Sequence, residues 1–305
     1  MSSTTWRDAA PISGPRARIA TAVLVTLALA WVGWPVWGSW TAPDAATARA
    51  LMPSLISALG GLLLVLGWAL WRDAGRRVEV FAPVVLVATA ATLVRFLLSP
   101  GTSGVEPAFV LPLLAGAALG SPAGFLTGAL ACLGSSALLG LYTEHLVAQT
   151  LVWGLFGLVG GLFRNSGARA AWIGCVIVGT LLGPISGVLL NTAGWVGDAG
   201  APAGGFLLGA GPWESLTRLV DYSLTTSFAV DTARGITTAV LAFIVGFPVI
   251  RGLRATVGDP VPSTTPIKPP PQRIDAAAIQ RRERSDHLST LWQPKETDDE
   301  RSAQP

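Results

Sequence analysis

The sequence predicts an all-α membrane protein that folds as a helical bundle, and three observations support this. Of its 305 residues, 51% are hydrophobic and only 13% are charged, whereas a soluble domain carries about 25% charged residues. The mean hydropathy is +0.54, and the apolar residues gather in long tracts. Arginines cluster beside alternate tract ends. These features exclude disorder, a coiled coil, a collagen-like chain, a soluble enzyme core and a basic nucleic-acid-binding domain.

Eight apolar tracts are candidate spans, because about 20 residues of helix cross a hydrocarbon core about 30 Å thick. They are 19–40, 51–71, 78–98, 107–120, 122–142, 146–163, 170–193 and 235–253, of which the fourth and sixth are short. The fourth and fifth meet at Gly120-Ser121-Pro122, which leaves no room for a loop and predicts a helical hairpin. A β-barrel is disfavoured because the tracts lack alternating polarity.

Arginine positions orient these spans through the positive-inside rule. With eight spans, ten arginines fall on one side of the membrane: Arg7, Arg16, Arg18, Arg72, Arg76, Arg77, Arg164, Arg169, Arg251 and Arg254. The opposite loops hold three, which are Arg49, Arg218 and Arg234. Both chain termini are therefore predicted to lie in the cytoplasm.

The first tract, 19–40, admits a second interpretation as a cleavable signal peptide. Its apolar stretch is longer than the apolar part of a signal peptide, and it ends in Trp31, Trp34, Trp37 and Trp40. Tryptophans at this spacing are typical of an aromatic belt at the membrane surface. A retained transmembrane helix is favoured.

Two further segments lie outside the spans. In the long predicted outer loop 194–234, Pro212 suits the first turn of a helix. An apolar stripe at helical spacing follows it: Leu216, Leu219, Val220, Leu224 and Phe228. This helix is predicted to lie on the outer surface or over a cavity. Residues 255–305 combine prolines with mixed charges and predict a disordered cytoplasmic tail, with a short helix around 275–288.

Glycines recur four residues apart in the fourth to seventh tracts, as in Gly116 with Gly120 and Gly179 with Gly183 and Gly187. Membrane helices associate through such small residues because lipid tails offer no hydrophobic driving force between them. The glycines predict tight packing inside the bundle, and an alternative is that some of them face another membrane subunit.

Polar side chains near the predicted outer ends of the spans define a candidate binding site. Arg95 lies well inside a span, where an arginine costs about 2.5–3.5 kcal/mol. It is expected either to snorkel and pair with Glu106 or to contact a ligand. The other candidates lie within a turn or two of the same boundary: Glu106, Phe109, His145, Gln149, Trp153, Asn191 and Trp195. Trp153 would supply a flat apolar wall, and the segments 99–105 and 194–234 would close the pocket.

Motifs of catalysis, metal binding and nucleotide binding are absent from the sequence. It contains no HExxH, GxSxG or Walker A pattern. Cys132 and Cys175 lie in apolar tracts and are expected to be packed thiols, and the spacing of His145 and His287 does not suit zinc. The chain is therefore expected to be no enzyme and to bind no cofactor or ATP itself.

Four blocks of sequence carry a family resemblance. Residues 92–107 (TLVRFLLSPGTSGVEP), 120–125 (GSPAGF) and 153–158 (WGLFGL) resemble the substrate-binding S component of energy-coupling factor (ECF) vitamin transporters. Residues 225–234 (TTSFAVDTAR) are similar to the start of the final helix in a high-GC Gram-positive branch associated with corrinoid uptake.

The resemblance covers residues 78–254 and implies a six-helix S component that captures a vitamin from outside a bacterial cytoplasmic membrane. It implies a transmembrane coupling subunit and two cytoplasmic ATPases, which hydrolyse the ATP, as partners. The chain would then comprise a cytoplasmic N-terminus (1–18), two extra transmembrane helices (19–77), the core and the tail (255–305). An integral membrane enzyme acting on lipid and a structural membrane partner protein remain as alternatives, and no nucleic-acid partner is expected.

Overall fold

A computed structural model describes residues 14–98, 105–141, 143 and 145–257, and these residues form helices and no strand. Seven helices in this part are long and apolar enough to cross a membrane, and a shorter apolar helix covers Pro107–Leu119. The predicted fold class, an all-α membrane bundle, is confirmed. The predictions for the segment 99–104 and for the tail beyond residue 257 lie outside the described residues.

The helices fall into an N-terminal pair and a core. The pair is α1 (Pro15–Val32) and α3 (Ala45–Asp73), joined through α2 (Trp34–Trp37) and η2 (Ser39–Thr41). After η3 (Val78–Val80), the core comprises α4 (Phe81–Leu98), η4 (Pro107–Phe109), α5 (Val110–Leu119), α6 (Ser121–Leu139), α7 (Leu146–Gly160), η5 (Gly161–Phe163), α8 (Ala168–Trp195), η6 (Val196–Asp198), α9 (Pro212–Thr226) and α10 (Phe228–Val257).

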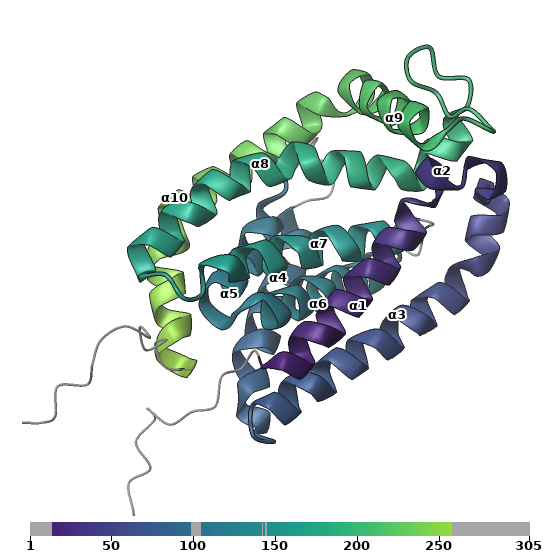
Figure 1. The fold of residues 1–305 in the computed structure, drawn as a ribbon. Helices are drawn as coiled ribbons and strands as arrows, with labels where there is room; N and C mark the ends of the chain where they lie inside the picture. The colour runs from purple at the N-terminus through teal and green to yellow at the C-terminus, as the bar shows by residue number, and fades with distance from the viewer. Residues whose placement is uncertain (1–13, 99–104, 142, 144, 258–305) are drawn as a thin grey trace, which may run out of the picture. The chain divides into compact units, whose positions relative to one another are not determined.

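The core helices α4–α7 lie between the α1–α3 pair and the α8–α10 pair (Figure 1). One apolar cluster joins Leu24 of α1 and Leu66 of α3 to Phe125 of α6. A second joins Phe156 of α7 to Ile250 of α10. We call the end of the bundle where α8 ends and α10 begins the α9 end, since α9 lies there.

Two predicted span boundaries are wrong. The tract 19–40 is not one helix, because α1 ends at Val32 and the short helix α2 begins after Gly33 with Pro35 in its first turn. The last span begins at Phe228 rather than at 235, so that Asp231 and Arg234 lie within the buried part of α10. Because charged residues are atypical of a span, the apolar pattern placed the start of this helix after them.

The predicted hairpin between the fourth and fifth tracts is confirmed. Gly120 is the single residue between α5 and α6, and its φ of +103° is one that L side chains rarely adopt. The two helices then run back along each other so closely that a Cβ on Gly124 would collide with the Cα of Gly116. Only glycine permits both the turn and the contact.

The glycine pattern serves packing inside this chain. A Cβ at Gly116 or Gly124 would overlap the carbonyl of Gly157 in α7, and one at Gly128 would overlap that of Trp153. A Cβ at Gly183 of α8 would overlap the backbone of α10. At these four positions another subunit has no room, because the chain's own backbone occupies the space.

Two buried arginines lie 20 residues apart on α10. Because a helix rises about 1.5 Å per residue, Arg234 and Arg254 are separated by about 30 Å, the thickness of a hydrocarbon core. Arg254 donates hydrogen bonds to the carbonyls of Ala117 at 2.9 Å, Phe163 at 3.0 Å and Ser166 at 2.7 Å. It thereby caps the C-terminal end of the short helix α5. Both arginines belong to a helix, whereas the charge count assigned them to loops.

Candidate functional site

Arg95 lies in the last turn of α4, at the α9 end of the bundle. Its guanidinium donates hydrogen bonds to the hydroxyls of Ser135 at 2.9 Å and Ser136 at 3.3 Å, and to the side-chain oxygen of Gln149 at 3.4 Å. The guanidinium carbon also lies 5.3 Å from the ring centroid of Trp153, within the range of a cation–π interaction. We call these five residues the Arg95 cluster.

Among the residues that the structure describes, the partners of Arg95 are neutral groups. Ser135 donates its own hydroxyl proton to the carbonyl of Ala131 at 2.7 Å, which leaves its oxygen free to accept from Arg95. None of the carboxylates in the described part of the chain forms an ion pair with Arg95. The half-buried guanidinium is therefore solvated by neutral side chains and paired with no carboxylate of the described residues.

A second polar cluster surrounds Arg234, and we call it the Arg234 cluster. Arg234 donates to the carboxylate of Asp231 at 2.7 Å and to the hydroxyl of Ser186 at 3.4 Å, and it lies 3.4 Å from the carboxylate of Glu106. The side chains of Arg234 and Asp231 are 7% and 5% exposed. Ser227 donates to the other oxygen of Asp231 at 2.6 Å. This arginine is thus neutralised by two carboxylates.

The predicted pairing of Arg95 with Glu106 is wrong, since Glu106 pairs with Arg234 instead. Sequence proximity favoured Arg95, only eleven residues away. The folded chain brings the second turn of α10 to the start of η4, so the arginine that is more distant in the sequence pairs with Glu106. Arg234, Asp231 and Ser186 were not among the predicted site residues. One sequence feature could have identified Asp231 and Arg234 as parts of a span: the apolar stretch Phe228 to Val230 directly precedes them.

Phe109 connects the two clusters. Its ring centroid lies 4.7 Å from that of Trp153 and 4.7 Å from that of Phe156. The guanidinium carbon of Arg234 lies 5.6 Å from the same Phe109 ring. Two arginines therefore contact a continuous group of buried aromatic rings, one at Trp153 and the other at Phe109.

Asn191 contacts α9 rather than the Arg95 cluster. Its side-chain nitrogen donates to the hydroxyls of Ser223 at 2.9 Å and Ser227 at 2.8 Å. The buried face of α9 is formed by Ser215, Leu219 and Ser223. The predicted helix is confirmed, but most of its apolar stripe is exposed, including Leu216, Val220 and Leu224. The face of α9 that packs on the bundle thus combines two serines with Leu219, and most of its apolar stripe points outward.

Trp195 and His145 lie apart from both clusters. Trp195 is fully buried, donates to the carbonyl of Gly204 at 2.9 Å and packs on Phe206, so it holds the loop after α8. His145 lies before α7, against Gly194. Beyond this loop Tyr222 donates a hydrogen bond to Asp198. Burial, together with that carboxylate, raises the pKa of Tyr222 to about 12.

The structure therefore divides the eight predicted site residues. Arg95, Gln149 and Trp153 form one cluster, Glu106 belongs to another, and Phe109 joins the two. Two cavities, of about 510 and 40 Å³, lie elsewhere at the α9 end, and none of the eight residues lines either of them. In the described segments no group of three histidine, cysteine or acidic side chains could hold a metal ion.

Comparisons of the chain with protein-family models, with curated proteins and with solved structures give no match.

Proposed function

We propose that this chain is the membrane-embedded subunit that captures a vitamin or related micronutrient, such as a corrinoid, for an ATP-driven importer of the ECF type. The observation that carries the proposal is that Arg95 has only neutral partners among the described residues. An arginine inside a span is costly unless it faces protein, water or a ligand. Here the neutral partners orient the guanidinium, and an anionic or carbonyl group of a ligand would supply the missing complement.

The chemistry of the Arg95 cluster favours a ligand that combines a ring with one polar group. The buried ring of Trp153 supplies an aromatic environment beside Arg95, and Gln149 can rotate to accept or donate a hydrogen bond. Several carboxylates, among them Glu106, Asp198, Glu214 and Asp221, lie at or near the same end. Their combined charge disfavours a polyanionic ligand.

The energy for transport would come from other chains. This sequence carries no phosphate-binding loop, so a transmembrane coupling subunit and two cytoplasmic ATPases would act with it. The helices α4, α6, α7, α8 and α10 are long enough to span, and the shorter apolar helix α5 would complete the six-helix plan of an S component. The pair α1 and α3 would be an addition to that plan, in a bacterial cytoplasmic membrane with both termini inside.

Ligand binding by the purified protein tests this proposal. The full chain would be extracted gently, placed in nanodiscs and examined by native mass spectrometry for a retained small molecule. A panel of radiolabelled vitamins and corrinoids would then be tested for binding. We expect one ligand to bind, and Arg95→Gln to weaken it about tenfold to a hundredfold, the loss of one hydrogen bond to a charged group.

Arg251→Gln is the matched control, because Arg251 is an exposed arginine on α10 that contacts only the ring of Phe247 in the described structure. It should bind the ligand as the wild type does. Equal affinity of the Arg95→Gln protein and the wild type would place the site elsewhere. No binding across the whole panel, with no retained molecule, would contradict the capture function itself.

A further inference from the structure

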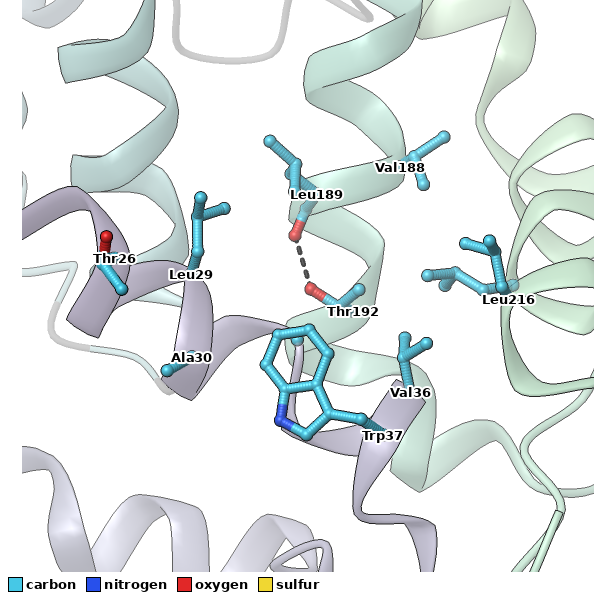
Figure 2. Close-up of a pocket in the computed structure, with 11 residues that line it drawn as sticks. Thr26, Leu29, Ala30, Val36, Trp37, Val188, Leu189, Thr192 and Leu216 are labelled. Carbon is cyan, nitrogen blue, oxygen red and sulfur yellow. Dashed lines mark hydrogen bonds between the residues drawn. The ribbon is translucent and has the colours of Figure 1, made fainter. Parts of the chain in front are cut away.

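The larger cavity lies where the N-terminal helices meet the core, at the α9 end. It has a volume of about 510 Å³, within the range of about 300–1,000 Å³ typical of small-molecule sites. Leu29 and Ala30 of α1 form one wall, Val188 of α8 forms the opposite wall, and Leu216 of α9 lies at its edge (Figure 2). Its lining thus comes from three segments that are far apart in the sequence.

The lining is almost wholly apolar. Of its eleven residues only Thr26, Trp37 and Thr192 have a polar side-chain atom, and none is charged. The hydroxyl of Thr192 donates to the carbonyl of Leu189 in the same helix at 2.6 Å, as Figure 2 shows. A charged or strongly polar occupant would lose its hydration without gaining partners. The chemistry therefore selects an apolar occupant.

The cavity is continuous with the surface that faces lipid. Trp37 and Leu216, two of its lining residues, are 55% and 39% exposed. Leu27 of α1 and Val220 of α9, which follow the lining residues Thr26 and Leu219 in the sequence, are also exposed and apolar. In a bundle of membrane-spanning length, exposed apolar side chains of this kind contact acyl chains. An acyl chain can therefore enter the cavity without crossing water.

Helix α9 is suited to the surface of a bilayer. Most of its apolar side chains are exposed, as are its charged residues Glu214 and Asp221. A helix with both kinds of surface lies at the boundary between headgroups and acyl chains. The cavity beside it is then at the depth where the acyl chains begin, and the exposed Trp37 and Trp40 are residues typical of that depth.

We propose that this cavity binds an acyl chain of a membrane phospholipid, held between α1 and α8 next to α9. The bound chain would fill the junction between the N-terminal helices and the core, and its headgroup would lie at the level of α9. This site is separate from the Arg95 cluster and does not depend on a transport function.

Photolabelling in nanodiscs tests the site directly. The probe is phosphatidylcholine with a diazirine on one acyl chain, and labelled peptides are located by mass spectrometry. We expect several-fold stronger labelling of residues 26–37 and 188–192 than of the exposed apolar faces around Leu64 of α3 and Ile177 of α8. Equal labelling of all these faces would overturn the proposal.

Filling the cavity supplies a second test. Val188→Phe and, separately, Ala30→Phe should reduce labelling of the lining several-fold, because the added ring occupies the space of the acyl chain. Ile185→Phe is the matched control on the exposed face of α8 and should leave the labelling unchanged. Size-exclusion chromatography identifies the variants that fold, and one folded filling variant suffices.

The proposal is contradicted if a folded variant with a filled cavity is labelled as strongly as the wild type. A diazirine-labelled free fatty acid provides the last comparison. If it labels the lining while the phospholipid does not, the occupant is a free amphiphile and the phospholipid assignment is wrong.

Discussion

The two arginine clusters at the α9 end differ in how the protein treats the same charge. Arg234 is almost fully buried and contacts two carboxylates and a hydroxyl. Arg95 is half-buried and contacts two hydroxyls, an amide oxygen and an aromatic ring. Both lie against the same group of aromatic rings. Arg95 contacts Trp153, Arg234 contacts Phe109, and these two rings pack on each other. Their surroundings thus differ in burial and in negative charge.

This difference separates a structural arginine from one that is free to act. A buried ion pair is held in place because removal of one partner leaves an unpaired charge in a poorly solvated interior. An arginine solvated by neutral dipoles can be replaced at lower cost, yet its field still attracts an anion. We therefore expect Arg234 to matter for folding and Arg95 for binding.

The largest expected effect comes from Arg234→Gln. It leaves the carboxylates of Asp231 and Glu106 without their cation, and the cost of breaking a buried pair is about 3–5 kcal/mol. Because Glu106 is 33% exposed, water can solvate part of its charge, and the lower end of that range is expected. Thermal unfolding in detergent measures the loss, with the exposed Arg251→Gln as the control.

A triple variant sharpens this test. Glu106→Gln and Asp231→Asn, added to Arg234→Gln, remove all three charges together and should restore part of the lost stability. Stability of Arg234→Gln equal to that of the wild type would show that the cluster is not held by its ion pairs.

Gly187→Ala should have the next largest effect, because it acts on the same cluster through packing. A Cβ on Gly187 would overlap the carboxylate of Asp231, and overpacking of this kind costs about 1–3 kcal/mol. Gly60→Ala in α3 is the matched control, since no heavy atom lies within 4 Å of its added Cβ. Thermal unfolding of both variants should show a loss for Gly187→Ala only.

Arg95→Gln should change stability by no more than about 1 kcal/mol, since the lost hydrogen bonds are offset by removal of an uncompensated charge from a poorly solvated place. The same unfolding measurement applies. If Arg95→Gln lowers the stability as much as Arg234→Gln does, the two clusters do not differ in this way and Arg95 is a structural residue.

The smallest expected effect concerns Tyr222, whose hydrogen bond to Asp198 lies outside both arginine clusters. Its pKa of about 12 exceeds the ordinary value of 10 because of burial and the Asp198 carboxylate. Since the folded state holds this proton more tightly, its contribution to stability is complete below pH 10 and disappears as the pH rises through about 12.

Absorbance titration of Tyr222 measures this pKa in a Tyr142→Phe background, because the chain has only two tyrosines. Asp198→Asn should lower the pKa of Tyr222 toward 10, while Asp221→Asn, at an exposed position on the same helix, should not. An unchanged pKa in the Asp198→Asn protein would show that burial alone raises it.

Much of this architecture follows from local sequence. The length and apolar content of the tracts predict membrane-spanning helices, since each must satisfy its own backbone hydrogen bonds in lipid. Gly120-Ser121-Pro122 predicts the hairpin, because a glycine at positive φ followed by proline can both end one helix and start the next. The helix beginning at Pro212 is predicted for the same local reason.

Tertiary structure alone decided how the charges pair. Glu106 lies eleven residues from Arg95 and 128 residues from Arg234 in the sequence, but the packing of α10 against η4 brings the second arginine to it. Likewise, the pattern of α9 predicts an apolar stripe but not that most of the stripe faces outward, while Asn191 binds the serines on the buried side. Local spacing fixes a helix and its faces, whereas the partner of a face or a charge depends on which helices pack together.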